Sequence, residues 1–477
     1  MHWRITLEAI DPIGDGYRKE FMIEKDLDGL ADGKLGCSIE DGKAIMKEVQ
    51  RIVIARQLDL WVRYCRACPT CDGLLPIKDY NQRKILTVFG EIAVRFPRLM
   101  VCQKCHPACC FTFSPAANIC KDRATPELLE LSARLGAKFS YREASDVLAT
   151  FLPDQSARTF TTLRNRTLAV GKRIEEAERQ QRWFEDLNYP DRTQLELALA
   201  GDPAREFVFN VDTAHIPLLK WYGGRTFEAI VGHCGRGGRG DPPGPVFAFE
   251  GTHPRELKAV AALALKRQGY ADQGDITVIS DGAECLKRLA GMLPQPVTHI
   301  LDWFHISMKI QPLTQLGATA PKYMPNFEGR MERIRWRLWN GQAGRALSLI
   351  AKVRWDLSRE MVPSIWAHRA DKLLETLQVY IRRNKRSVVN YAERYRDGKR
   401  VSTAPAEASV NRLVAKRFVK KQQMRWSRTG AHYLLKVRAS VLKGDLSKRT
   451  KYEAPKQAIP SNIASFISPA PPLLRAA

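Results

Sequence analysis

Carboxylates follow apolar, strand-like segments in the middle of the sequence. Asp212 lies near the end of the alternating segment EFVFNVDTAHI, Asp281 directly follows DITVIS, and Asp302 follows VTHIL. Carboxylates at the ends of neighbouring strands supply the oxygen ligands that Mg²⁺ or Mn²⁺ prefers. A pair of such ions can activate a water or a 3′-hydroxyl for in-line displacement at phosphorus. A single strand-end aspartate commonly caps the next helix, so only the combination indicates metal chemistry.

A third carboxylate ligand is expected from Glu407, in the segment APAEASVNRL. Pro405 suits the first turn of a helix, which would place Glu407 in that turn. The helix dipole alone also favours Glu at such a position. Glu407 lies close in sequence to the basic runs KRFVKK and MRWSR, which would bring metal chemistry beside a phosphate-binding surface.

Most of the cysteines lie between residues 64 and 120, where two CxxC pairs stand out. Cys68 and Cys71 form the first pair, Cys102 and Cys105 form the second, and the residues between them predict two strands around Gly90. This order is typical of a zinc ribbon, in which four thiolates bind one structural Zn²⁺ and supply folding free energy that a small core lacks. Further candidate ligands leave the assignment open and allow a second site: Cys65, His106, Cys109, Cys110 and Cys120.

The composition is that of a globular protein with a large positive charge. The 477 residues carry a formal net charge of +25, with 44% hydrophobic and 27% charged residues, which excludes a disordered chain, a collagen and a small disulfide scaffold. No secretion signal is visible, and the most apolar run, AVAALAL, is far shorter than the roughly 18 residues that span a bilayer. We therefore expect a cytoplasmic protein with reduced cysteines and no membrane association.

The positive charge is concentrated in one region. Residues 331–460 hold 31 Lys and Arg against 10 Asp and Glu, in runs interleaved with aromatic residues. Any one run is most simply a solvated helix face, but several runs together favour a surface that contacts phosphates. The candidate DNA contacts in this region are Arg382, Arg383, Lys385, Arg386, Lys420 and Arg425.

A helical region is expected after the cysteines. Its pattern predicts two amphipathic helices broken near Gly136, and a third helix capped by Ser156 or Thr159 that carries Arg164 and Arg166. A basic last helix is compatible with reading of the DNA major groove. A small bundle that links two domains is the alternative interpretation.

Together these motifs resemble the DDE transposases of bacterial insertion sequences, most closely the Kra-type group related to the Mutator-like elements. The resemblance rests on CPTC and CQKC, FSYREAS, VDTAHI, ISDGAECL, LDWFHI and the stretch from AEASVN to MRWSRTGA, which run from about residue 64 to 435. It implies an α/β fold with an RNase H-like core of the retroviral-integrase type. The 125 residues between Asp281 and Glu407 would then form an all-helical insertion.

The resemblance also implies the site. Asp212, Asp281 and Glu407 match its three acids, which would hold two Mg²⁺ or Mn²⁺ ions, with Glu393 and Glu375 as alternatives for the third position. Asp302 and His305 match a C/D-x₂-H motif, and His305 would help to position DNA or water. The expected partners are terminal inverted repeats and target DNA, bound by a homo-oligomer in the nucleoid.

The expected domain order follows from these assignments. A strand and helix region (1–63) precedes the zinc-ribbon-like domain (64–124) and the helical DNA-binding region (125–200). The core (201–308 and 401–445) is interrupted by the helical insertion (309–400), and a disordered tail (446–477) follows. The predicted function is metal-dependent DNA cleavage and strand transfer. The alternatives are an inactive transposase-derived DNA-binding protein and an RNase H-like nuclease without strand transfer.

Overall fold

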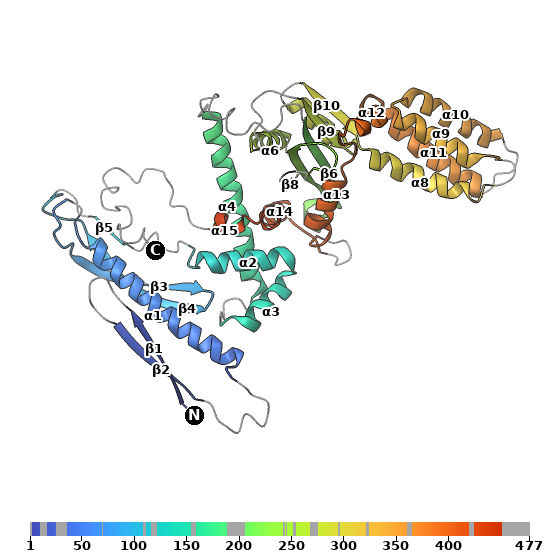
Figure 1. Cartoon of the computed structure of the whole chain (residues 1–477). Coiled ribbons are helices and arrows are strands. Elements are labelled where there is room, and N and C mark those ends of the chain that lie inside the picture. The colour runs from blue at the N-terminus through green and yellow to red at the C-terminus, as the bar shows by residue number, and fades with distance from the viewer. Residues whose placement is uncertain are drawn as a thin grey trace, which may run out of the picture. The chain divides into compact units, whose positions relative to one another are not determined.

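The computed structural model divides the chain into two compact units (Figure 1), one made of residues 1–170 and 446–477 and the other of residues 171–445. It describes residues 2–9, 17–24, 36–68, 70–107, 111–115, 122–153, 159–187, 206–241, 244, 246–250, 254–267, 275–293, 296–320, 324–359, 365–418 and 424–450.

The first unit begins with an antiparallel strand pair and a long helix. Strands β1 (His2–Ala9) and β2 (Tyr17–Glu24) pair with each other, and α1 (Ile39–Cys65) follows. The hydroxyl of Ser38 accepts a hydrogen bond from the Asp41 N–H, and the Asp41 carboxylate accepts one from the Ser38 N–H. This reciprocal pair satisfies free N–H groups at the start of α1.

A three-stranded antiparallel sheet lies between the two cysteine pairs. Strands β3 (Ile77–Thr87) and β4 (Gly90–Met100) form a hairpin, and β5 (Thr112–Phe113) pairs with β4. Thr87 pairs with Gly90 across a two-residue turn, and Gly90 has a φ of 116°, a backbone conformation that L side chains rarely adopt. The hairpin around Gly90 is thus confirmed.

Three helices follow the sheet: α2 (Pro126–Lys138), α3 (Tyr141–Phe151) and α4 (Phe160–Leu187). The break predicted near Gly136 falls three residues later in the chain. Gly136 lies inside α2, where a Cβ would come within 2.4 Å of the Thr167 hydroxyl, so the glycine permits close helix packing. The chain instead turns at Phe139 and Ser140, where Ser140 and Glu143 form a capping box at the start of α3. The predicted cap Ser156 lies outside the described residues.

The boundaries of this region also differ from the prediction. The division between the two units falls inside α4, between Val170 and Gly171. The predicted tail begins with a short helix, α15 (Leu446–Thr450), which packs against α2 within the first unit. Leu446 is fully buried, which explains why these five residues are ordered. The remainder of the predicted tail lies outside the described residues.

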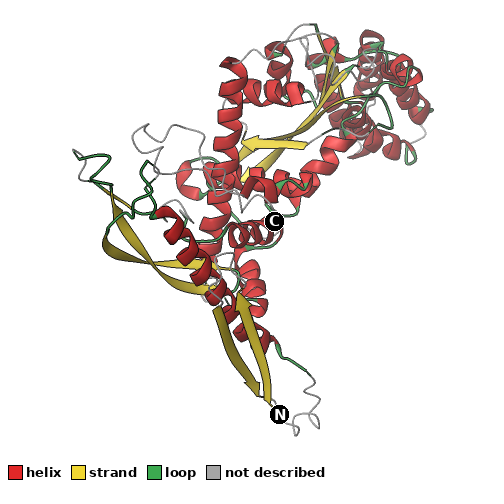
Figure 2. Ribbon diagram, turned by 60° about the vertical axis from the view of Figure 1, so that its left-hand side comes forward, coloured by secondary structure: helices red, strands yellow, loops and turns green. Residues whose placement is uncertain are grey.

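The second unit contains a mixed five-stranded sheet (Figure 2) with the strand order β10-β9-β6-β7-β8. Strands β6, β7 and β8 are antiparallel neighbours, whereas β9 and β10 run parallel to β6. The strands are β6 (Phe207–Pro217), β7 (Thr226–Arg236), β8 (Val246–Glu250), β9 (Ile276–Ser280) and β10 (Val297–Leu301).

Helices cover both faces of this sheet. Phe207, Phe209 and Val211 pack with α6 (Pro254–Arg267) and α7 (Glu284–Met292). On the opposite face lie α13 (Ala404–Val410), which contacts β6 and β7, and α14 (Arg428–Lys443), which contacts β8. The alternation predicted for the first strand is confirmed, because Val208 faces a different core cluster.

Between Asp281 and Glu407 the described chain is mainly helical. The elements are α8 (Trp303–Gly317), α9 (Phe327–Trp339), α10 (Ala343–Arg359), α11 (Ile365–Arg383) and α12 (Tyr391–Arg396). They share one apolar core, which includes Ile310, Ile334, Ile350 and Leu374. Helix α8 starts directly after β10, so the helical part begins at Trp303, six residues before the predicted boundary. Within the described part of the chain, no helix is both long and apolar enough to cross a membrane.

Candidate functional site

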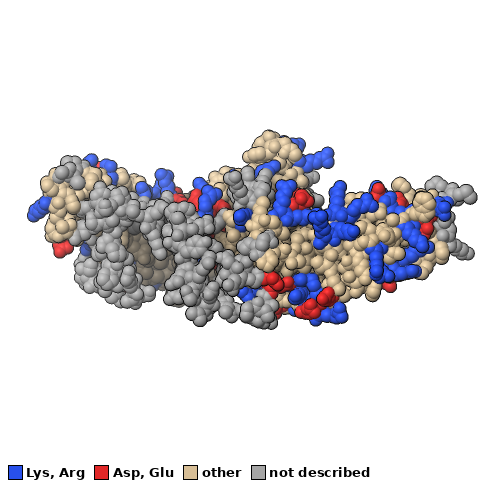
Figure 3. Space-filling view, turned by 90° about the horizontal axis from the view of Figure 1, so that it is seen from above, with Lys and Arg blue, Asp and Glu red and all other residues tan. Residues whose placement is uncertain are grey.

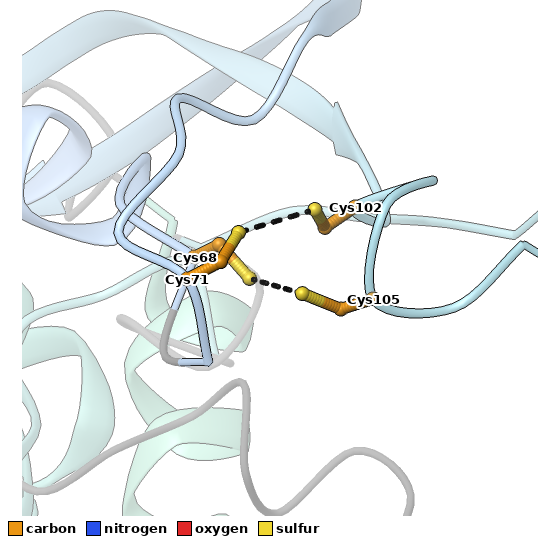
Figure 4. Close-up of side chains that lie close together, drawn as sticks. All are labelled: Cys68, Cys71, Cys102 and Cys105. Atoms are coloured by element: carbon orange, nitrogen blue, oxygen red, sulfur yellow. Dashed lines mark hydrogen bonds between the residues drawn. The ribbon is translucent and has the colours of Figure 1, made fainter.

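The four predicted zinc ligands lie together in the first unit (Figure 4). The Sγ atoms of Cys68 and Cys105 are 3.9 Å apart, those of Cys71 and Cys102 are 3.7 Å apart, and all four lie within 4.8 Å of one another. Sulfurs on a tetrahedron around Zn²⁺, with Zn–S distances of about 2.3 Å, would be about 3.8 Å apart. The cluster is therefore suited to hold one structural zinc ion.

The backbone shapes both cysteine pairs for a metal. The Cys68 N–H donates to the Gly73 carbonyl and the Asp72 N–H donates to the Cys68 carbonyl, which closes the first knuckle. In the second, the backbone N–H of Cys105 lowers the pKa of the Cys102 thiol, and the adjacent Cys71 thiol raises the pKa of Cys105. The surrounding groups thus favour the thiolate at Cys102, while the neighbouring thiols oppose ionisation of Cys105, an effect that a bound cation would relieve.

The additional cysteines do not extend this cluster in the described residues. Cys65 is half-buried and outside the group, and burial raises the pKa of its thiol to about 11, which disfavours the thiolate that binds metals. His106 is likewise not among the four ligands. Cys109, Cys110 and Cys120 lie outside the described residues, so the second site stays a prediction.

In the second unit the sheet register aligns the aspartates. The parallel pairing of β6 with β9 ends at Asn210 opposite Ile279, and continuing it by two residues sets Asp212 beside Asp281. The pairing of β10 with β9 ends at Leu301 opposite Ser280, and one more step sets Asp302 beside Asp281. The three aspartates therefore lie at corresponding positions just past the paired segments of three neighbouring strands. The sequence predicted that Asp212 lies near the end of its strand. Strand β6 instead continues to Pro217, so Asp212 lies in mid-strand.

Electrostatic interaction links Asp212 to the other predicted site residues. Burial, together with the negative charges of Asp281 and Glu407, raises the pKa of the Asp212 carboxyl to about 6, against the lowering effects of the Thr213 N–H and of His305. Asp212 is only 6% exposed. The structure thus brings Asp281, Glu407 and His305 into electrostatic range of Asp212. Their ligand atoms are not all within 4.8 Å of one another, unlike those of the cysteine cluster.

The raised pKa of Asp212 predicts a stability cost above pH 6. As pH rises from about 4 to 6, the unfolded chain loses the Asp212 proton before the folded chain does, so folding becomes less favourable and stays so at higher pH. Without divalent cations, Asp212→Asn should raise the free energy of unfolding at pH 7.5 by up to about 3 kcal/mol. The asparagine oxygen can still accept the Thr213 N–H, which supports the local backbone.

Urea denaturation of both proteins at pH 7.5 and pH 4 measures this difference. The gain from Asp212→Asn should shrink toward pH 4, and Mg²⁺ should stabilise the wild type more than the variant. Asp397→Asn, at an exposed aspartate of the same unit, serves as the control and should change stability little at either pH. A stability gain from Asp212→Asn that is equally large at pH 4 would contradict a raised pKa for Asp212.

Asp302 connects three elements at the site. Its side chain is fully buried and accepts hydrogen bonds from the Phe304 N–H at 2.8 Å, from His305 Nδ1 at 2.9 Å and from the Thr403 hydroxyl. Burial lowers the pKa of His305, but its hydrogen bond to Asp302 and the negative charges of Asp302, Asp212 and Asp281 outweigh this effect and raise the pKa overall. Asp302 thus orients His305 at the start of α8.

Two further contacts hold the helix that carries Glu407. Thr403 is the N-cap residue of α13, and its carbonyl accepts the Glu407 N–H at 3.0 Å. Two residues beyond Glu407, the Ser409 hydroxyl bonds the buried His233 of β7, whose other ring nitrogen bonds the Gly244 carbonyl. Sequence reasoning missed Thr403, Ser409 and His233, because each partner is more than 100 residues away along the chain.

The alternatives for the third acid have other partners. Glu393 accepts a hydrogen bond from the Asn390 side-chain amide at the start of α12, and Glu375 lies 3.8 Å from Arg354. Neither contributes to the pKa shift of Asp212, whereas Glu407 does. Glu407 is therefore the better placed of the three acids.

One of the predicted basic runs lies beside Asp281. The Tyr380 hydroxyl donates to the Asp281 carbonyl at 2.8 Å, and the Asn384 side chain packs against Gly282. Four exposed cationic residues adjoin these contacts: Arg382, Arg383, Lys385 and Arg386. Figure 3 shows Lys and Arg side chains gathered on the visible face of the helical part. The run is therefore next to the second acid in space.

The other predicted DNA contacts differ in exposure. Arg164 and Arg425 are exposed, and Arg425 also reaches the Leu218 carbonyl at 3.5 Å. Arg166 is 7% exposed inside the packed helices, because it lies on the face of α4 that carries Leu163 and Val170, so it is not retained as a DNA contact. Lys420 lies outside the described residues.

Comparison with models of known protein families finds no match, and comparison with curated proteins finds none either. The assignment of function therefore depends on the residues and their geometry.

Proposed function

We propose that the chain is a DDE-type DNA transposase that binds the ends of an insertion sequence and catalyses metal-dependent strand cleavage and strand transfer. The observation that carries the proposal is the electrostatic interaction of Asp212 with both Asp281 and Glu407. These three acids come from a mid-sheet strand, the end of its parallel neighbour and a helix across the sheet, and they are the acids that the resemblance selects.

The arrangement of the second unit supports the proposal. Three antiparallel strands precede two parallel ones, and helices separate the second acid from the third. This order is compatible with an RNase H-like core that is interrupted by a helical insertion. No covalent bond between protein and DNA is needed, because the carboxylates act as ligands and not as nucleophiles.

The donor set fits divalent cations. Asp212, Asp281 and Glu407 present oxygen ligands, and the repulsion that raises the pKa of Asp212 would be relieved by positive charge. When bound, two such ions would supply the Lewis acidity for activating a water or a 3′-hydroxyl and for stabilising the leaving oxygen. His305, oriented by Asp302, would donate a hydrogen bond to a phosphate or to an ordered water. The buried Asp302 accepts hydrogen bonds from His305 and Thr403, and thereby fixes the start of α8 relative to the start of α13.

The basic run beside Asp281 gives the DNA a path to the acids. Replacing Arg382, Arg383, Lys385 and Arg386 by Gln should weaken DNA binding and lower the slope of log K against log salt by about 2 to 4, since each phosphate contact contributes about 0.9. Fluorescence anisotropy with a labelled duplex at several salt concentrations measures the slope.

A control that removes the same charge elsewhere makes this measurement specific. Arg4, Arg51, Arg63 and Lys84 are each paired with an acid within the first unit. Their replacement by Gln should change the slope less than the first set does. Equal slopes for the two quadruple variants would show that residues 382–386 form a solvated surface and do not contact DNA phosphates.

The function itself is tested on DNA that flanks the gene, because that DNA would carry the element's ends. Purified protein with Mg²⁺ should nick these fragments at discrete 3′ ends and join them to a target plasmid. Cleavage without joined products would favour a nuclease. Normal DNA binding without cleavage would favour an inactive transposase-derived protein. Assembly of two end fragments on one protein complex would support the expected homo-oligomer.

A further inference from the structure

The turn between β6 and β7 presents aromatic side chains that the acid site does not use. Trp221 is 77% exposed and Tyr222 is 53% exposed, and their ring centroids are 6.3 Å apart. They belong to the 3-10 turn Lys220–Tyr222, which Gly223 and Gly224 close in left-handed conformations. Two adjacent large aromatic side chains in solvent form an exposed apolar patch of the kind that marks an interaction site.

The base of this turn is held firmly. Leu218 is fully buried, its N–H donates to the Arg225 carbonyl, and it bridges to Trp426. The backbone of Trp426 bonds both Pro217 and Leu219, and its ring packs on Phe418. Trp426 is thus buried and holds the base of the turn, whereas Trp221 is exposed on the turn itself. A rigid support lowers the entropy that a ligand must overcome on binding.

The charge around the turn is positive. Lys220, Arg225 and Arg425 are exposed around the aromatic pair, and the sequence has no acidic residue between Leu218 and Thr226. Aromatic rings flanked by cations are the chemistry that binds single-stranded nucleic acid, because bases stack on the rings while phosphates meet the cations. A contact with another protein surface would not require this charge.

We propose that Trp221, supported by Tyr222, is a stacking platform for an unpaired nucleobase of the bound DNA. The proposal rests on the proposed function and extends it, because it assigns a subsite to a splayed DNA strand. Strand β6 ends five residues beyond Asp212, at Pro217, and the turn follows. At about 3.3 Å per residue this is roughly 17 Å, or about five nucleotide steps of roughly 3.4 Å each. The stacked base would therefore lie several nucleotides from the cleaved bond.

The test compares two labelled DNA probes with the full-length, zinc-loaded protein. One probe is a 30-base-pair duplex, and the other is the same duplex with an unpaired thymidine fork at one end. Trp221→Ala should weaken binding to the fork about tenfold or more, while binding to the closed duplex changes by less than about twofold. Trp221→Tyr should retain most of the fork affinity, and Trp221→Leu should not, because it keeps apolar bulk but loses the ring face.

Trp355→Leu provides a matched control, because Trp355 is also an exposed tryptophan, at 60%, but lies on α10. It should leave the preference for the fork unchanged. If the wild type binds and cleaves DNA but Trp221→Ala binds the fork normally, the stacking site is refuted and the proposed function stands. If the wild type binds neither probe, both fail. A smaller oligomer for Trp221→Ala together with normal fork binding would also refute the proposal and assign the turn to a contact between copies.

Discussion

Asp212→Asn, Asp281→Asn and Glu407→Gln are each expected to reduce Mg²⁺-dependent strand cleavage by on the order of 10³-fold or more. Each substitution removes one anionic oxygen ligand while it preserves the shape of the side chain. Loss of a ligand weakens cation binding and misplaces the attacking oxygen, and several kcal/mol of transition-state stabilisation correspond to this factor. Cleavage of the flanking-DNA fragments, resolved on a denaturing gel over time, measures the effect.

DNA binding separates this result from misfolding. The three variants lose negative charge near the DNA path, so their affinity for DNA without Mg²⁺ should be unchanged or higher. Glu375→Gln and Glu393→Gln are the matched controls, because they make the same change at acids that have other partners. Both should retain cleavage. Full cleavage by Asp212→Asn or Asp281→Asn would contradict the proposed function. Loss of cleavage in Glu393→Gln, but not in Glu407→Gln, would identify Glu393 as the third metal ligand.

Removal of zinc is expected to have the largest effect on folding. Structural zinc contributes about 10–16 kcal/mol in small zinc-binding units, and the core beside the cysteines is small: Cys68, Leu75, Leu99 and Cys102 are its buried members. Cys68→Ser or Cys102→Ser should therefore abolish zinc binding and expose β3–β5 to proteolysis. The purified wild type should contain one zinc per cluster, and chelation should reproduce the protease sensitivity.

Cys37→Ser is the control for the zinc experiment, because Cys37 is exposed and outside the cluster. It should retain the zinc content and protease resistance of the wild type. Elemental analysis gives the metal content, and mass spectrometry locates the cleavage sites. A Cys102→Ser protein with wild-type zinc content and protease resistance would show that these thiols do not form the metal site.

The two sites differed in how far the sequence could predict them. Cys68 and Cys71 are set in one knuckle, Cys102 and Cys105 in another, and the hairpin between them has a two-residue turn at Gly90. All of this is local, so the spacing of the cysteines was sufficient to predict the cluster. A local pattern also predicted the alternation of β6 and the strand that precedes Asp281.

The contacts that position the acids could not be read from local patterns. Thr403 and Asp302 are 101 residues apart, and His233 and Ser409 are 176 residues apart. Their side chains meet only because α13 packs across the sheet. The same limitation explains the error for Arg166, since its helix was predicted correctly but the face that the packing buries was not.

By itself the sequence determined the local features: the two cysteine knuckles and their hairpin, the strands that precede the acids, and the concentration of positive charge between residues 331 and 460. Only the tertiary structure decided which carboxylates interact. Parallel strands are joined by long connections, so their register depends on how both faces of the sheet pack. That register sets Asp212 level with Asp281, and α13 then brings Glu407 close enough to raise the pKa of Asp212.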